Sequence, residues 1–299
     1  MRAAASLFGK EEEIAAIIAR MAGYGSIPPT GIVPAIQFEN VRLGFDEGEI
    51  LRGVSFGVQE RETLILLGET GTGKTLTLKL CAGLLRPDSG CVEVLGEKIS
   101  DMPEKELLKF RRKIGFVFQE GALFDSLPVS GNVAYRLHED GVPEEEIEAR
   151  VREVLRVVEL EHTLDQLPSE LSGGMRRRIS IARALINRPP IVLYDSPTAG
   201  LDPVTSQTII TMILRLRDVY GVTALLATHR LQDGFALANF HFDVDNNRIV
   251  SNSQNGTAAA AAEAARTRFL VYRDGGVYFD GEPEEIANSE DPYLKRFLV

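Results

Sequence analysis

The sequence predicts an α/β fold with a largely parallel, covered β-sheet, and three observations predict it. Short apolar runs, such as TLILLG (63–68), IVLY (191–194) and VTALLAT (222–228), are typical of buried strands. Stretches with helical periodicity, such as residues 144–160 and 206–221, lie between such runs. The run at 63–68 also leads through a glycine-rich turn into a helix predicted over 75–84. Strands that alternate with helices favour parallel pairing through helical crossovers.

Changes in composition divide the chain into an N-terminal unit, a main domain and a tail. Residues 1–34 form a short amphipathic helix and a proline-containing linker, and residues 35–285 form the main domain. That domain opens with an antiparallel β part (IQFENVRLGF, VSFGV), is mostly helical from about 103 to 188, and carries a helical subdomain at about 120–188. Hairpins are predicted around 246–247 and 275–276, with an alanine-rich insertion at about 250–268. Residues 286–299 form a C-terminal tail.

Composition indicates a globular protein and argues against nucleic-acid binding. The 299 residues are 44% hydrophobic and 25% charged, with a net charge of −10, whereas a phosphate backbone needs concentrated Lys and Arg. The basic cluster 176–178 is expected to be a solvated helix start. No apolar run approaches the roughly 18 to 20 residues of a membrane span, and charge interrupts the first residues, so we expect a cytoplasmic chain. Cys81 and Cys91 are expected to be reduced, buried thiols.

The segment GETGTGKT (68–75) fits the phosphate-binding pattern G-x-x-x-x-G-K-[ST] between a buried strand and a helix. Glycines let backbone N–H groups wrap an anion, and the helix start adds its positive end. Lys74 is predicted to reach the β- and γ-phosphates, and the Thr75 hydroxyl is predicted to ligate Mg²⁺. A glycine-rich turn without a ligand is the alternative. The candidate nucleotide contacts are Gly68, Glu69, Thr70, Gly71, Thr72, Gly73, Lys74, Thr75 and Leu76.

A second metal ligand is predicted at the end of another buried strand. The run IVLYD ends at Asp195, whose carboxylate would hold Mg²⁺ directly or through water. An acidic residue that merely caps a strand is the alternative for this motif alone.

The segment LSGGM (171–175) resembles the LSGGQ signature of the ATP-binding cassette (ABC) family of P-loop NTPases, and the resemblance extends over about 36–240. It implies that Gln119 belongs to the Q-loop and ligates the metal, that Asp202 ends the D-loop AGLD, and that His229 is the switch histidine. Phe45 matches the aromatic residue that stacks on adenine, although it could equally be a core residue. The implied catalytic residues are Lys74, Gln119, Asp195, Ser196 and His229.

The family resemblance also implies an assembly of two cassettes with a membrane permease. In this family the signature of one subunit completes the ATP site of another, in a homodimer or a heterodimer. Ser172, Gly173 and Gly174 begin a predicted helix, so they offer a second anion-binding helix terminus to the γ-phosphate.

A narrower resemblance is to the ATPases of Mla/Mce-type lipid transport systems. It rests on FQEGALFDSLPVSGNVAYRL (118–137), on Met175 in the signature and on the ending DPYLKRFL (291–298). It implies phospholipid or another apolar substrate, an MCE-type substrate-binding protein, and a peripheral position on the inner face of the membrane. An importer ATPase for another solute, such as an amino acid, is the alternative.

One departure from the family pattern bears on hydrolysis. Hydrolytic cassettes normally carry Glu after the strand-end Asp, and here that residue is Ser196. Glu120, in a loop expected to be mobile, and Glu69, inside the phosphate cradle, are weak substitutes. We therefore expect a slow ATPase, or a nucleotide-gated cassette with little hydrolysis.

Overall fold

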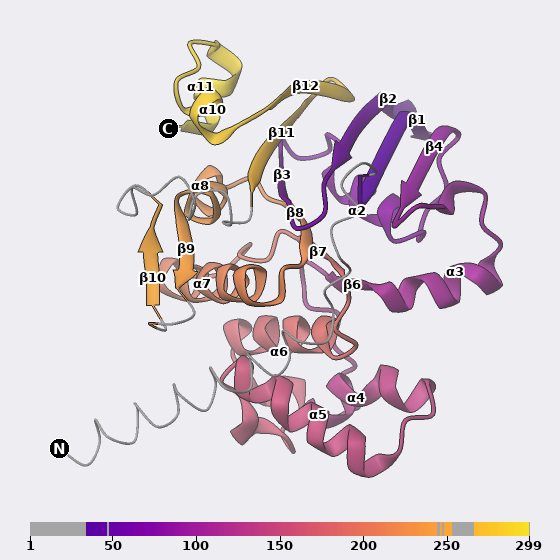
Figure 1. Ribbon diagram of the computed structural model, residues 1–299, viewed down its shortest axis with the longest axis vertical. Helices are drawn as coiled ribbons and strands as arrows, with labels where there is room; N and C mark the ends of the chain where they lie inside the picture. The colour runs from indigo at the N-terminus through magenta and orange to yellow at the C-terminus, as the bar shows by residue number, and fades with distance from the viewer. Residues whose placement is uncertain (1–33, 47, 244–245, 247, 253–265, 299) are drawn as a thin grey trace.

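A six-stranded sheet lies at the centre of the computed structural model, which describes residues 34–46, 48–243, 246, 248–252 and 266–298 (Figure 1). The strand order is β12-β11-β3-β8-β7-β6, and only β12 runs antiparallel to its neighbour. The predicted largely parallel sheet is therefore confirmed. Its strands are β3 (Thr63–Leu67), β6 (Ile114–Val117), β7 (Ile191–Asp195), β8 (Thr223–Ala227), β11 (Thr267–Arg273) and β12 (Gly276–Gly281).

A second, antiparallel sheet of order β2-β1-β4-β5 forms the predicted antiparallel part. Its inner face shares one apolar core with α2 and with one face of the large sheet, through side chains such as Leu51, Leu78 and Leu64. Helix α2 begins one residue before its predicted start and ends three residues before its predicted end. The elements on this side are β1 (Ile36–Phe45), β2 (Gly48–Val58), α2 (Lys74–Cys81), β4 (Ser89–Val94), β5 (Glu97–Lys98) and α3 (Glu104–Phe110).

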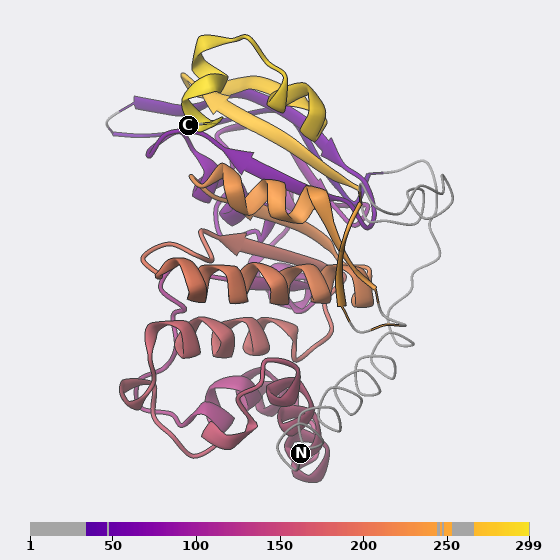
Figure 2. The same cartoon turned by 90° about the vertical axis from the view of Figure 1, so that its left-hand side faces the viewer.

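Helices cover the other face of the large sheet and continue into a helical subdomain. Figure 2 shows α8, α7 and α6 stacked in layers, with α4 and α5 beyond them. Their inward side chains, among them Ile213 on α7 and Ile179 on α6, form a second apolar core with Leu226 of β8. The helices are α4 (Val129–Glu139), α5 (Glu144–Val157), α6 (Gly173–Leu185), α7 (Pro203–Tyr220) and α8 (Leu231–Asn239). Short 3-10 turns are η1 (Ile99–Asp101), η2 (Arg111–Lys113), η3 (Glu161–Thr163) and η4 (Pro168–Glu170).

The C-terminal segment packs onto the main domain. The expected boundary after residue 285 falls inside α10 (Pro283–Ala287), and Leu294 of α11 (Pro292–Leu298) is only 3% exposed. Both predicted hairpins are present, as β9 (Phe240–Asp243) with β10 (Arg248–Ser251) and as β11 with β12. The expected insertion at 250–268 overlaps β10 and β11 at its ends, and its alanine-rich part lies outside the described residues, as does the predicted helix of residues 1–34.

Three expectations from the sequence need correction or completion. The stretch 103–188 contains the strand β6, which pairs with β7. Burial raises the pKa of the Cys81 thiol, but Cys91 is partly exposed. Arg177 is only 7% exposed, although the basic cluster was expected to be solvated.

Among the described helices, none has the length and apolar character needed to cross a bilayer.

Candidate nucleotide site

Four of the predicted site residues lie at or just beyond one edge of the large sheet. Strands β3, β8, β7 and β6 are mutually parallel, so their carboxyl ends share that edge. Gly68 follows β3, Gln119 follows β6 by one residue, Asp195 ends β7, and His229 follows β8 by one residue. In open α/β sheets, ligands bind beyond the carboxyl ends of the strands. The strand order therefore gathers motifs that are far apart in the sequence.

The loop between β3 and α2 has the backbone of a phosphate cradle. Gly68, Gly71 and Gly73 have φ values of 146°, 85° and 102°, in the region that favours glycine. A Cβ at Gly73 would lie 2.3 Å from the Leu51 Cδ2, and one at Gly68 would lie 3.0 Å from the Tyr272 backbone oxygen. The loop can therefore keep this path only with glycine at these positions. Glu69, Thr70, Thr72 and Leu76 complete the segment, which opens into the first turn of α2.

Lys74 lies inside this loop. Its Nζ donates to the carbonyl oxygens of Gly68 at 2.7 Å and of Glu69 at 2.8 Å, so the ammonium group is held over the turn. Burial lowers the pKa of Lys74, and the nearby Asp195 opposes that shift. A partly desolvated cation next to free backbone amides suits a polyphosphate anion.

Two oxygen donors suited to a hard cation meet between α2 and β7. The Thr75 hydroxyl donates to Oδ1 of Asp195 at 3.0 Å, and Asp195 is 5% exposed. Burial raises the pKa of this carboxyl, while the Thr75 hydrogen bond and nearby Lys79, Lys74 and Arg177 oppose the rise. Across the described ranges, no group of three or more His, Cys, Asp and Glu residues could hold a metal. The Thr75 hydroxyl and the Asp195 carboxylate fit Mg²⁺, which is commonly held by one or two protein groups together with substrate phosphates.

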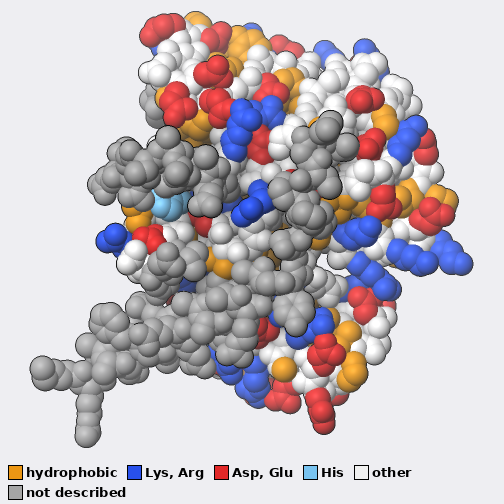
Figure 3. All heavy atoms as spheres, in the orientation of Figure 1, with side chains coloured by type: hydrophobic (Ala, Val, Ile, Leu, Met, Phe, Trp, Pro, Cys, Tyr) orange, Lys and Arg blue, Asp and Glu red, His pale blue; other side chains and the backbone are white. Residues whose placement is uncertain are grey.

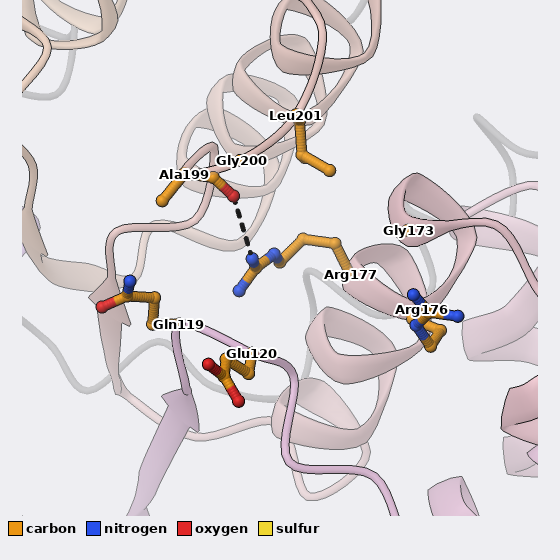
Figure 4. Close-up of a pocket in the computed structure, with 8 residues that line it drawn as sticks. All are labelled: Gln119, Glu120, Gly173, Arg176, Arg177, Ala199, Gly200 and Leu201. Carbon is orange, nitrogen blue, oxygen red and sulfur yellow. Dashed lines mark hydrogen bonds between the residues drawn. The ribbon is translucent and has the colours of Figure 1, made fainter.

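Gln119 is presented by a tight turn after β6. The Gly121 N–H donates to the Phe118 carbonyl oxygen at 2.9 Å, so Gln119 and Glu120 form the exposed tip. Within the described residues, no hydrogen bond connects Gln119 to Thr75 or Asp195. Figure 4 shows both tip side chains beside the guanidinium of Arg177 in a cavity of about 490 Å³.

The signature segment forms the start of α6, as expected. Ser172 is the N-cap residue, and its Oγ accepts from the Met175 N–H at 3.2 Å. A Cβ at Gly174 would lie 2.4 Å from Cγ2 of Thr205, so glycine permits α6 to pack against the start of α7. Ser172 and Gly173 remain exposed. This helix end can therefore meet an anion from outside the chain.

The loops after β7 and β8 carry the remaining predicted residues. Asp202 caps α7, because its carboxylate accepts from the Thr205 N–H at 3.0 Å and from the Thr205 hydroxyl at 2.5 Å. Ser196 has a left-handed backbone (φ 47°) and is half-buried, and His229 is exposed. Phe45 ends β1 with 52% of its surface exposed, so its ring is accessible for stacking.

Two buried charged residues in this region were missed as site candidates. Arg177 donates to backbone carbonyls on both sides of the cavity, and Asp233 accepts hydrogen bonds from Thr198 and Thr228. Three consecutive helical residues span about 200° of a helix circumference. Because α6 packs against α4, α5, α7 and β6, one of the three arginines is buried, but the sequence does not indicate which. No comparable signal in the sequence indicated Asp233.

Comparison with known proteins relates the chain to ATP-binding cassettes. A family model described as ABC transporter matches residues 51–199. Protein TRIGALACTOSYLDIACYLGLYCEROL 3, chloroplastic, of Arabidopsis thaliana is 34% identical over 88% of this chain and 73% of its own length. The methionine import ATP-binding protein MetN of Carboxydothermus hydrogenoformans is 40% identical over 66% of this chain, but the match covers only 58% of that protein. Among solved structures, the dimeric post-hydrolysis ATP-binding cassette MJ0796 bound to ADP and Pi has a TM-score of 0.67 and 30% identity, over 83% of this chain and 98% of that one.

Proposed function

We propose that this chain, which belongs to the ABC transporter family, couples MgATP hydrolysis to the movement of phospholipid or another apolar substrate through a separate permease. As a cassette of this family it is a P-loop ATPase that binds ATP with Mg²⁺ and works as a dimer with membrane permease subunits. The substrate, the MCE-type partner and the role of each residue are the proposal. We place the chain on the inner face of the membrane, held there by the permease.

The hydrogen bond between Thr75 and Asp195 is the observation that carries the assignment of the ATP site. It brings a strand-end carboxylate to the first turn of α2, directly beside the Lys74 ammonium in the glycine-rich loop. Bound Mg²⁺ would supply neutralisation of phosphate charge at this point. Lys74 and the loop amides orient the β- and γ-phosphates, and Gln119 and His229 arrange the attacking water.

Ser196 makes the single cassette a slow enzyme. Its hydroxyl can hold a water molecule but is far too weak a base to accept the proton, and a positioned general base contributes about 10²- to 10⁴-fold. Residual hydrolysis comes from positioning and charge neutralisation. The closed ATP-bound dimer is therefore long-lived, and either a second cassette with a complete site or the permease accelerates its turnover.

A groove beside the Gln119 turn is the surface that we assign to the permease. It has a volume of about 340 Å³ and lies between β6, α4 and α6. Two ring pairs line it, Phe116 with Phe118 at 4.1 Å and Phe124 with Tyr135 at 4.7 Å between centroids. Phe124 and Tyr135 are exposed aromatic residues, a type enriched at protein interfaces. Lys and Arg side chains also gather over the adjacent α3, at the right-hand edge of Figure 3.

Two observations favour a lipid substrate. The segment 118–137, which supplies three of the four aromatic rings of this groove, resembles the corresponding segment of Mla/Mce-type ATPases. The Arabidopsis relative is named after trigalactosyldiacylglycerol, a glycolipid. The second candidate is an amino-acid importer, because other relatives are named methionine import ATP-binding proteins.

Reconstitution distinguishes these candidates. The chain and its permease are placed in liposomes, and phosphate release is measured while phospholipid, an MCE-type protein or methionine is varied. Stimulation by the MCE-type protein with phospholipid supports the lipid system, whereas stimulation by methionine alone supports the importer. A chain that binds no MgATP contradicts both.

A further inference from the structure

The turn that carries Gln119 is fixed to α6 at both of its ends. Arg177 donates through Nη1 to the Phe118 carbonyl oxygen at 2.8 Å, on the near side of the tip. Arg183 donates to the carbonyl oxygens of Ala122 at 2.8 Å and Gly121 at 2.9 Å, on the far side. All three are hydrogen bonds from a charged donor, roughly twice as strong as neutral ones. The turn must therefore move together with α6, instead of forming the mobile loop expected from the sequence.

Arg177 also reaches the loop after β7. Its Nη2 donates to the Ala199 carbonyl oxygen at 3.4 Å, three residues before Asp202. In Figure 4 the guanidinium lies between this loop and the Gln119 turn, and Arg176 lies apart from it. Because guanidinium is planar and rigid, a shift of one carbonyl is transmitted to the other.

The burial of Arg177 indicates that this arrangement has a function. Burial lowers the pKa of Arg177, and the nearby carboxylates of Asp195 and Glu120 oppose this shift. The side chain remains charged, because a guanidinium is not deprotonated in proteins. A buried cation costs free energy unless its donors are satisfied, and two of these donors meet backbone carbonyls of two loops of the nucleotide site. An apolar residue would fill the same space at lower cost.

We infer that Arg177 is a positioning residue that couples the two ATP sites of the cassette dimer. The start of α6, with Ser172, serves the nucleotide of the second subunit, whereas Gln119 serves the chain's own nucleotide. Arg177 lies about one helical turn further along α6 and donates a hydrogen bond to the Phe118 carbonyl oxygen beside Gln119. Binding of the second subunit's nucleotide at the start of α6 therefore shifts Gln119. This inference rests on the proposed function, because it requires a dimer that closes on ATP.

Variants of neighbouring arginines test the inference with a matched control. Arg178 lies on the same helix and donates to the Val158 carbonyl oxygen at 3.1 Å, at the end of α5 and away from the nucleotide loops. Arg177→Met, Arg177→Lys and Arg178→Met are compared with wild type in the full chain. The measurements are kcat, KM and the Hill coefficient for ATP in phosphate release, nucleotide affinity of the monomer by calorimetry, and the melting temperature.

We expect a wild-type Hill coefficient above 1, since the two sites are coupled. Arg177→Met should lower kcat by about 10- to 100-fold and bring the Hill coefficient to 1, because a small misplacement of a positioning group can cost 10²-fold. Monomer affinity should stay within about threefold, because the phosphate loop is unchanged. Arg177→Lys should recover part of the wild-type kcat and Hill coefficient, because lysine can keep one of the two hydrogen bonds. Arg178→Met should keep kcat and the Hill coefficient near wild type, even if its melting temperature is lower.

Several results would overturn the inference. A wild-type Hill coefficient of 1, an Arg177→Met variant with kcat and Hill coefficient within twofold of wild type, or an equal loss in Arg178→Met would each do so. If wild type neither dimerises with ATP nor hydrolyses it, the proposed function fails as well, and wild type alone shows this. If wild type is active and Arg177→Met does not change kcat or the Hill coefficient, only the coupling role of Arg177 is excluded.

Discussion

Replacement of Ser196 by Glu tests how this cassette hydrolyses ATP. Ser196 follows Asp195 directly, and its backbone is fixed by two hydrogen bonds. Its N–H donates to the Ala227 carbonyl oxygen at 2.8 Å, and its own carbonyl accepts from the Ala199 N–H at 3.0 Å. Neither bond uses the side chain. Ser196→Glu therefore places a carboxylate at the end of β7 without removing a backbone contact of the turn.

The expected gain follows from the missing proton acceptor. A positioned general base contributes about 10²- to 10⁴-fold, equivalent to about 2.7 to 5.4 kcal/mol of barrier. The introduced side chain has more rotatable bonds and a neighbourhood adapted to serine, so we expect an increase of about 10- to 100-fold, at or below the low end of that range. The left-handed φ of 47° strains serine and glutamate alike, so stability should change little.

Steady-state phosphate release at saturating MgATP measures the effect, with Ser196→Gln as the control. Glutamine has the length and shape of glutamate but cannot accept the proton, so its variant should stay at or below the wild-type rate. The reasoning is refuted if wild type alone already turns over near the ordinary enzyme median of about 10 s⁻¹ and Ser196→Glu gives no increase. Another group would then be the base, and Glu120→Gln would be the next variant to measure.

Three further changes test other parts of the site. Lys74→Ala should weaken nucleotide binding at least about tenfold or abolish turnover, because it removes the charge held in the phosphate loop; equal calorimetric affinity and activity would contradict this. Ser172→Arg should leave monomer binding intact but block the ATP-dependent dimer in light scattering, and an unchanged mass increase would count against it. Burial raises the pKa of Asp233, so its contribution to stability is greatest below the unfolded pKa of about 4 and is lost as pH rises through the folded value. The difference in melting temperature between Asp233→Asn and wild type should therefore shift in favour of Asp233→Asn as the pH rises from about 4 through the folded pKa of Asp233, and a constant difference would exclude this account.

The sequence predicted the elements with strong local signals. Buried runs of four apolar residues gave β3, β7 and β8, and the glycine spacing gave the phosphate loop. Strand β6 was missed because its four residues, IGFV, directly follow three basic residues inside a stretch of helical character. Its existence depends on pairing with β7, which periodicity cannot show. Residues 286–298 were predicted as a tail because their docking depends on a nonlocal core, which buries Ile286 and Leu294.

The candidate site was predicted in its motifs but not in its connections. Each phosphate or metal residue belongs to a short segment of recognisable spacing, so its place could be named in advance. The Gln119 turn is held by contacts between residues that are far apart in the sequence. Arg177 and Phe118 are separated by 59 positions, and Arg183 and Gly121 are separated by 62 positions. Such pairs leave no local signature, because any long basic side chain on that face of α6 could reach a carbonyl. Only the packing of α6 against the turn decides which arginine is buried.

The arrangement of the exposed residues supports the proposal that two chains together complete the ATP site. The Thr75 hydroxyl contacts Asp195 at the end of β7, whereas Gly174, next to the exposed Ser172 and Gly173, lies against Thr205 at the start of α7. In the described ranges, no hydrogen bond joins residues 68–76 to residues 171–175. A helix end with free amides and an exposed cap is stabilised when an anion approaches it. In the proposed dimer, the γ-phosphate held by a second subunit would supply that anion, and the dimeric MJ0796 cassette has the corresponding fold. Closure of the dimer would then complete this helix end with a ligand, which is how we propose that ATP drives the assembly.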